Sequence, residues 1–244
     1  MAENKVAISV VVPVKDEAGN IAPLAREIAA AMASAKESSY EIIFVDDGSS
    51  DATVAELLAL RRELAALRIV KHGRNLGQSR AIRTGVRAAR GAVVVTLDGD
   101  GQNDPADMPK LLAIMRQPLP PAMVAGERTK RQDSWRKRAA SRYANGFRRW
   151  LLADNAKDTG CGLKAFRRDA FLALPYFDHM HRYLITLMLR EGYEVRFVAV
   201  GHRARTSGRS KYGVWDRLVV GVSDILGVLW LKRRFRGPIE IEEL

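Results

Sequence analysis

The chain has 244 residues, of which 47% are hydrophobic and 28% charged, so its composition excludes a disordered or repeat-built protein. Its length allows one large α/β domain, although two small domains stay possible on length alone. The 40 Lys and Arg residues outnumber the 28 Asp and Glu residues by 12, and the single cysteine, Cys161, excludes an internal disulfide.

Apolar runs separated by helix-sized segments follow one another over the first half of the chain. The β-branched run 6–14 is typical of a strand buried on both faces. Further strand-like runs lie at 41–45, 67–71, 92–97 and 122–125, and helical spacing is found at 21–32 and 54–64. Each gap has room for one helix, as βαβ units require. The sequence therefore predicts a mostly parallel α/β sheet flanked by helices.

Two helix starts are indicated, and beyond residue 128 the regular alternation fades. Thr53 to Glu56 fits a capping box, and Asp104 precedes a proline suited to a first helical turn. The second half predicts a basic helix at 136–152, an irregular loop at 158–164, helices at 181–190 and 214–231, and a strand at 195–200.

An acidic, glycine-containing turn follows the fourth strand-like run. In extended chain Asp98, Asp100 and Gln102 point the same way, at the sheet edge where open α/β sheets bind ligands. Their oxygens suit a hard cation such as Mg²⁺ or Mn²⁺, which substrate phosphates would complete. Alone, the pattern could be only a helix cap. A second acidic turn, 46–51, after an earlier parallel strand favours a site.

The positive charge is concentrated in the second half. Residues 126–150 carry nine Lys and Arg against two acidic residues, 202–217 carry five against one, and 232–236 add four. Such a surface suits the phosphates of a ligand, a membrane or a nucleic acid.

A series of short motifs follows one another along the chain, at 12–17, 45–51, 75–78, 98–102, 126–128, 158–164 and 205–212. As an ordered set they resemble the inverting family 2 glycosyltransferases of GT-A fold, and within them the dolichol-phosphate mannosyltransferase-like polyprenyl-phosphate glycosyltransferases. The resemblance runs from residue 8 to about 236. Asp16 replaces the usual asparagine of the first motif, and Gly99 stands between the metal-site aspartates.

The resemblance implies a role for each matching residue. Pro13, Glu17 and Asp46 would line the base and ribose pocket, while Asp98, Asp100 and Gln102 would hold the metal and the diphosphate. Arg128, Arg205 and Lys211 match positions that meet phosphates, with Ser210 in the same loop as Lys211. A further family arginine corresponds to one of residues 136–138. Arg138 is chosen, and the register stays open. Asp100, Arg128, Arg205 and Lys211 are the expected catalytic residues.

The same resemblance implies the reaction. A nucleotide-sugar, GDP-mannose or a UDP-sugar, would donate to a polyprenyl or dolichyl phosphate with inversion, in a domain divided into 1–127 for the donor and 128–213 for the acceptor. A lipid phosphate, with a second pKa of about 6, is already nucleophilic at neutral pH and needs no strong protein base. No nucleic-acid partner is expected.

Residues 214–236 are predicted to form an amphipathic helix at an anionic membrane surface. Asp216, Arg217, Ser223 and Asp224 interrupt the apolar segment, which is too polar to span a bilayer. Because residues 1–4 are polar and resemble no export signal, a cytoplasmic protein is expected, attached peripherally to the inner face of the cytoplasmic membrane, with a membrane protein as a possible partner.

Two alternatives stay open. The acceptor could be a hydroxyl of a glycolipid or polysaccharide, for which Asp158 could be the general base. A non-enzymatic protein that binds a membrane or nucleic acid would also explain the charge. His179 and His181 lack the usual zinc-ligand spacing and are assigned a structural or acceptor-loop role.

Overall fold

In the part of the chain that the structure describes, seven strands form one sheet in the order β3-β2-β1-β4-β6-β5-β7. This computed structural model describes residues 6–129, 151–152, 154, 156, 158–203 and 214–237, with only the backbone for 214–220. The strands are β1 (Ile8–Val14), β2 (Tyr40–Asp46), β3 (Leu67–Lys71), β4 (Val93–Thr96), β5 (Met123–Arg128), β6 (Lys164–Arg167) and β7 (Val195–Val200). All neighbouring strands are parallel except the two pairs that contain β6. The predicted mostly parallel sheet is confirmed.

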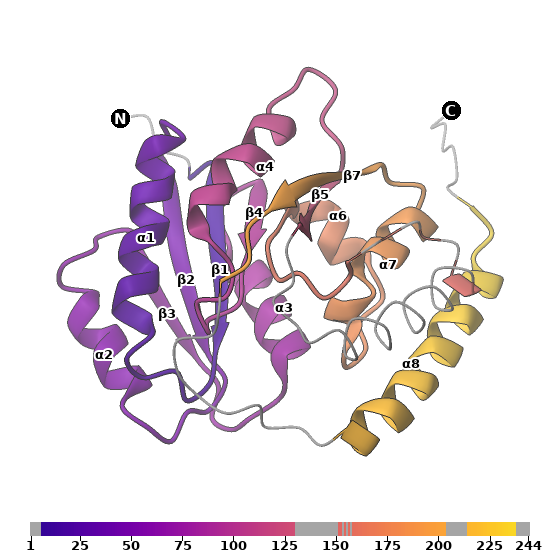
Figure 1. The fold of residues 1–244 in the computed structure, drawn as a ribbon, viewed down its shortest axis with the longest axis horizontal. Helices are drawn as coiled ribbons and strands as arrows, with labels where there is room; N and C mark the ends of the chain where they lie inside the picture. Colours follow the sequence, from indigo (N-terminus) through magenta and orange to yellow (C-terminus); the bar gives the residue numbers. More distant parts are fainter. Residues whose placement is uncertain are drawn as a thin grey trace, which may run out of the picture.

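Helices cover both faces of this sheet (Figure 1). They are α1 (Ile21–Ser34), α2 (Thr53–Leu60), α3 (Gln78–Ala88), α4 (Met108–Met115), α6 (Arg168–Ala173), α7 (Leu184–Arg190) and α8 (Val214–Arg234), with 3₁₀ turns η1 (Pro105–Asp107) and η2 (Met180–Arg182). In β1, Val10 and Val12 pack with α1, α2 and α4, while Val11 packs with α3, α6 and α7. Successive side chains of a strand point to opposite faces, so each face of β1 is buried.

The strand register brings three carboxyl ends to one edge of the sheet. Val14 of β1 pairs with Asp46 of β2, and Val11 pairs with Thr96 of β4. Thr96 is two residues before Asp98, so the two acidic turns begin on either side of the end of β1. This is the edge where the sequence predicts the site.

Strand β6 was not predicted. Its four residues follow the segment 158–164 that the sequence marks as an irregular loop, and four residues are too few to show a period. It runs antiparallel between β4 and β5. As a result, the loop before it returns to the carboxyl edge beside Asp98.

The two predicted helix starts have different outcomes. The capping box at Thr53 is wrong, because α2 begins at Thr53 itself and the side chain of Asp51 accepts from the Thr53 N–H at 3.0 Å. The Glu56 carboxylate accepts a hydrogen bond from the backbone N–H of Gly19 instead. Asp104 does cap the next helical segment, because its side chain accepts from the N–H of Ala106.

Helix α8 lies beside the second half of the sheet, far from α1 and α2 (Figure 1). Its Val228 is fully buried, the Tyr183 hydroxyl donates to the carbonyl of Gly221, and Arg190 donates to that of Leu231. The predicted C-terminal helix is therefore confirmed and is packed onto the domain. No helix among the described residues is both long and apolar enough to cross a membrane.

Candidate active site

The end of β2 carries a buried carboxylate with an unused oxygen. Asp46 is fully buried, and its Oδ1 accepts from the N–H of Ser49 at 3.2 Å. Its Oδ2 has no hydrogen-bond partner within the described segments. Buried polar atoms are nearly always paired, so this oxygen is suited to an N–H or O–H of a ligand.

The other two residues predicted for the base pocket lie close by. Pro13 is buried in β1, where it pairs with Val45, the neighbour of Asp46. Glu17 is half-buried and accepts from the Asn20 side chain at 2.8 Å. The structure thus places all three predicted base and ribose residues at adjoining ends of β1 and β2.

Asp98, just beyond β4, lies in a dense hydrogen-bonded setting. Its Oδ1 accepts from the Gln78 amide at 2.7 Å, and its backbone N–H donates to the side chain of the buried Asn103 at 2.9 Å. A Cβ at position 162 would clash with Oδ2 of Asp98, so only glycine fits at Gly162. The loop before β6 therefore closes tightly over this carboxylate.

The electrostatics of Asp98 are unusual for a carboxylate. Burial and the neighbouring charge of Asp100 raise its pKa to about 6, against the opposing effects of Lys164, Gln78 and Arg128. Two close carboxylates, one of them largely desolvated, repel each other when both are ionised. A divalent cation would remove that repulsion, so the donor set fits the metal that the sequence predicts.

The rest of the acidic turn is held by backbone contacts. Asp100 Oδ1 accepts from the N–H of Gln102, whose carbonyl accepts from the N–H of Arg203. A Cβ at Gly99 would lie 2.9 Å from the Pro13 carbonyl, so the turn can approach β1 only with glycine there. No group of three His, Cys, Asp or Glu side chains suited to a metal occurs in the described residues. Two carboxylates completed by substrate phosphates remain the fitting arrangement.

Arg128 and Asp158 form a buried ion pair beside the same edge. Nε and Nη2 of Arg128 donate to the two Asp158 oxygens at 2.6 and 2.7 Å, and only 12% and 10% of the two side chains are exposed. This bidentate pair joins the end of β5 to the loop before β6. Both oxygens of Asp158, the base of the hydroxyl-acceptor alternative, thereby accept a hydrogen bond from Arg128.

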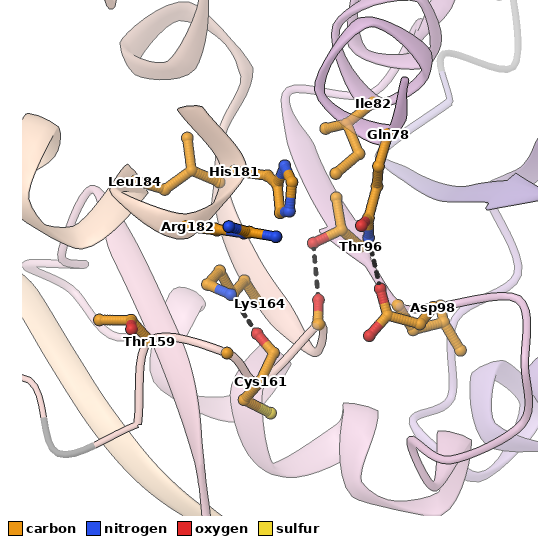
Figure 2. A pocket seen from close by; sticks show the side chains of 13 residues that line it. Gln78, Ile82, Thr96, Asp98, Thr159, Cys161, Lys164, His181, Arg182 and Leu184 are labelled. Atoms are coloured by element: carbon orange, nitrogen blue, oxygen red, sulfur yellow. Dashed lines mark hydrogen bonds between the residues drawn. The ribbon is translucent and has the colours of Figure 1, made fainter. Parts of the chain in front are cut away.

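A cavity of about 160 Å³ opens between Asp98, α3 and η2 (Figure 2). Polar groups from four parts of the chain line it, among them Gln78, Thr96, Thr159, Lys164, His181 and Arg182. Lys164 is almost completely buried and donates to the carbonyl of Cys161, and burial lowers the pKa of its ammonium group. Asp98 is the acidic residue of this lining, so the cavity adjoins the predicted metal site.

Sequence reasoning missed several residues of this site. Gln78 and Lys164 stand in motifs quoted above but had no role assigned, and Asn103 directly follows the acidic turn. His181 was assigned a structural or acceptor-loop role and gave no sign that it lines the cavity. Four predicted residues, Arg138, Arg205, Ser210 and Lys211, lie outside the described residues, so the structure places none of them.

The sheet is mostly parallel, and its carboxyl edge carries a candidate nucleoside pocket and a candidate two-carboxylate cation site. This is the architecture of the GT-A glycosyltransferases. The family can be stated more closely. The model of "Glycosyl transferase family 2" matches residues 9–174, and the chain belongs to that family. The chain is therefore an enzyme, and the non-enzymatic alternative is excluded.

The relatives agree with the predicted resemblance. Dodecaprenyl-phosphate galacturonate synthase of Rhizobium johnstonii is 33% identical over 234 residues, which cover 95% of this chain and 69% of that protein. Undecaprenyl-phosphate 4-deoxy-4-formamido-L-arabinose transferase of Edwardsiella ictaluri is 36% identical over 85% of this chain and 63% of its own length. This chain thus spans about two thirds of these relatives. The resemblance to polyprenyl-phosphate glycosyltransferases is confirmed.

A solved structure confirms the fold. Glucosyl-3-phosphoglycerate synthase from Mycobacterium tuberculosis, in complex with Mn²⁺, UDP and phosphoglyceric acid, matches with a TM-score of 0.71 at 20% identity, covering 94% of this chain and 79% of that one. At this identity the match concerns the fold alone.

Proposed function

We propose that this chain transfers a sugar from a nucleotide-sugar to a polyprenyl phosphate with inversion at the anomeric carbon. The observation that carries the acceptor assignment is the Arg128–Asp158 pair. Asp158 is the base candidate for a hydroxyl acceptor, and Arg128 engages both of its oxygens. A phosphate dianion needs no such base. The relatives' names support the same acceptor class.

The donor lies along the carboxyl edge in this proposal. Pro13, Glu17 and Asp46 receive the nucleoside, and the unpaired Oδ2 of Asp46 accepts a hydrogen bond from the base or ribose. Asp98 and Asp100 hold Mg²⁺ or Mn²⁺, and Gln102, whose backbone N–H donates to Asp100, is the third proposed ligand. When bound, the metal supplies positive charge that stabilises the departing diphosphate. The Mn²⁺ and UDP named for the structural neighbour are consistent with this assignment.

The acceptor phosphate is assigned to the basic residues of the second half. Arg128 lies at the end of β5, next to Gly160 of the cavity lining. Arg138, Arg205, Ser210 and Lys211 complete the proposed phosphate-binding set. Their charges hold the acceptor phosphate for attack in line with the leaving group and stabilise the charge that develops. Residues 1–127 then form the donor half and 128–213 the acceptor half.

Helix α8 supplies a surface suited to a bilayer. Val222, Leu226 and Trp230 are 54%, 61% and 58% exposed, and their spacing of four residues puts them on one stripe of the helix. Exposed Arg233 and Arg234 follow at its end. An apolar stripe beside basic groups suits the interface of an anionic membrane. The chain is accordingly assigned to the inner face of the cytoplasmic membrane as a peripheral protein. A membrane protein is proposed as a further partner.

The reaction can be tested with defined substrates. The protein is incubated with Mn²⁺, undecaprenyl phosphate and radiolabelled UDP-galacturonic acid, UDP-glucose or GDP-mannose, after a thermal-shift screen of the same donors with Mg²⁺ and Mn²⁺. We expect one donor to give an acid-labile sugar phospholipid. If label enters only a hydroxyl-linked glycolipid, stable to mild acid, the lipid-phosphate acceptor is wrong.

The membrane assignment is tested by charge in the apolar stripe. Leu226→Glu and Trp230→Glu should each lower binding to phosphatidylglycerol vesicles by about tenfold, because each places a carboxylate in the interface. Leu119→Glu is the matched control, since Leu119 is 82% exposed and lies on the loop between α4 and β5. Equal vesicle binding by all three variants and the unmodified chain would contradict the assignment.

A further inference from the structure

His181 lies on the wall of the cavity opposite Asp98. It belongs to η2, and in Figure 2 its ring lies between Gln78 and Ile82 of α3 on one side and Lys164 on the other. The histidine is half-buried and lines the cavity. The protein contact is with Ser79 of α3.

Two hydrogen bonds join these residues and fix the ring's protonation pattern. The backbone N–H of His181 donates to the Ser79 Oγ at 3.1 Å, and that Oγ lies 2.7 Å from Nδ1 of the ring. Ser79 is 1% exposed, and Nδ1 is the acceptor that its hydroxyl hydrogen meets within the described residues. Because a buried hydroxyl hydrogen is costly to leave unpaired, the hydroxyl donates to Nδ1. The ring proton is then on Nε2.

The surroundings keep this ring uncharged. Burial, the cations of Arg182 and Lys164, and the neighbouring His179 together lower the pKa of His181 to about 3. At neutral pH the ring is therefore a neutral group with a single N–H. Figure 2 shows the two ring nitrogens at opposite ends of the ring, one of them on the side of Arg182 and Lys164 of the cavity lining. Among the described residues, the hydrogen-bond partner found for the ring is Ser79, at Nδ1.

A neutral N–H donor opposite a cation site suits the uncharged part of the donor substrate. In the proposed function Asp98 and Asp100 would hold the metal and with it the diphosphate at one side of the cavity. His181 lies on the opposite wall, where the sugar attached to that diphosphate would be placed. Sugar hydroxyl and ring oxygens accept hydrogen bonds without carrying charge. A positively charged His181 ring would instead be repelled by the neighbouring cations of Lys164 and Arg182.

We infer that the Nε2–H of His181 donates a hydrogen bond to an oxygen of the transferred sugar, and that Ser79 is the positioning residue that keeps the proton on Nε2. This inference rests on the proposed function and names a residue that contacts the sugar rather than the nucleotide. A site built to hydrogen-bond a substrate oxygen discriminates strongly against analogues that lack it.

The test compares nucleotides with and without the sugar. Calorimetry with Mn²⁺ measures UDP against UDP-galacturonic acid, and GDP against GDP-mannose, for the unmodified chain and for His181→Phe and His181→Gln. We expect His181→Phe to bind the nucleoside diphosphate within twofold of the unmodified chain and the nucleotide-sugar about tenfold more weakly. Glutamine places an amide N–H near the position of Nε2–H, so His181→Gln should recover most of the loss.

Two results would overturn the inference. One is unchanged nucleotide-sugar affinity in His181→Phe, and the other is an equal loss for the diphosphate and the nucleotide-sugar in a variant that is folded by circular dichroism. Failure of the unmodified chain to bind any of the four nucleotides would instead overturn the proposed function.

The role of Ser79 has its own measurement, which needs no substrate. The ¹⁵N shifts of the His181 ring at pH 7 should show a neutral ring protonated on Nε2, and Ser79→Ala should give a mixture of the two neutral forms. A ring protonated on Nδ1, or a charged ring, in the unmodified chain would contradict the tautomer assignment. With Ser79→Ala we expect a loss of nucleotide-sugar affinity of about threefold, smaller than that of His181→Phe.

Discussion

The two acidic turns on either side of β1 look alike in sequence but are used differently in the structure. Each follows a buried parallel strand, and each combines aspartates with glycine. In the first turn, Asp47 Oδ1 accepts from the N–H of Leu76 and meets Nδ1 of His72, while Oδ2 accepts from the N–H of Gly77, all at 2.8 Å. Asp47 therefore holds the loop that leads into α3.

The second turn leaves its negative charge only partly compensated, by Lys164, Arg128 and the Gln78 amide. Asp98 has a neutral amide as its closest partner and Asp100 as a nearby like charge, and its pKa is raised to about 6. The comparison shows that the same local pattern can fix a loop or prepare a cation site. The difference depends on which backbone N–H groups the rest of the chain brings to the carboxylate.

Removing the metal-site carboxylate should have the largest effect. We expect Asp100→Ala to reduce sugar transfer by roughly 10³-fold, because the metal's stabilisation of the leaving diphosphate amounts to several kcal/mol. Initial rates and Mn²⁺-dependent nucleoside diphosphate binding measure the loss. Asp169→Ala is the control, since Asp169 is an exposed carboxylate on α6. Unchanged Mn²⁺-dependent binding in Asp100→Ala would exclude this cation site.

Removing the structural carboxylate should affect stability instead. Asp47→Ala leaves the N–H groups of Leu76 and Gly77 without their charged acceptor, and we expect a loss of about 3 kcal/mol in the free energy of unfolding. Urea unfolding measures it. A loss below about 0.5 kcal/mol, typical of surface substitutions, would show that the two turns do not differ as described.

Much of this contrast could not be predicted from sequence, although the edge itself could. The run 6–14 and the spacing of the later runs predicted the parallel strands, and the position of Asp98 after a buried strand predicted the site. The hydrophobic period of a strand and the position of a residue after it are local properties, so they can be recognised in a single sequence. The motifs also indicated the family.

The unpredicted features all depend on contacts between distant segments. Strand β6 is too short to show a period, yet it returns Gly162 and Lys164 to Asp98. The Ser79–His181 contact joins residues 102 positions apart. The predicted capping box does not form because the side chains of Thr53 and Glu56 accept hydrogen bonds from backbone N–H groups of the loop after β1. These N–H groups are distant in sequence, so local spacing does not reveal that they replace the N–H groups of the helix.

Competition between protons and Mn²⁺ for Asp98 in the second turn should have a smaller effect, which is a pH dependence of the Mn²⁺ affinity. Cations bind the ionised form of Asp98, whose pKa is about 6 in the unliganded protein. One unit below that pKa about a tenth of the carboxylates are ionised, so Mn²⁺ affinity should fall roughly tenfold between pH 7 and pH 5. Titration with Mn²⁺ at fixed ionic strength measures this. A flat profile over that range would contradict the raised pKa.

The smallest expected effect is a change in folding stability. Its sign differs between the two turns, because removing the Asp98 charge should stabilise the protein whereas removing the Asp47 charge should destabilise it. In the metal-free protein the raised pKa means that the folded state binds the Asp98 proton more tightly than the unfolded chain does, so stability falls as pH rises from about 4 to about 6. Asp98→Asn removes that ionisation and keeps an oxygen for the Gln78 amide. We therefore expect the variant to match the unmodified chain near pH 4 and to be more stable at pH 7 in EDTA, by urea unfolding. A shift of about two pKa units corresponds to at most about 3 kcal/mol, and solvent screening of this half-buried carboxylate reduces the expected difference to about 1 kcal/mol. If Asp98→Asn instead loses as much stability at pH 7 as Asp47→Ala, Asp98 is a structural carboxylate like Asp47, and the cation site must be assigned elsewhere.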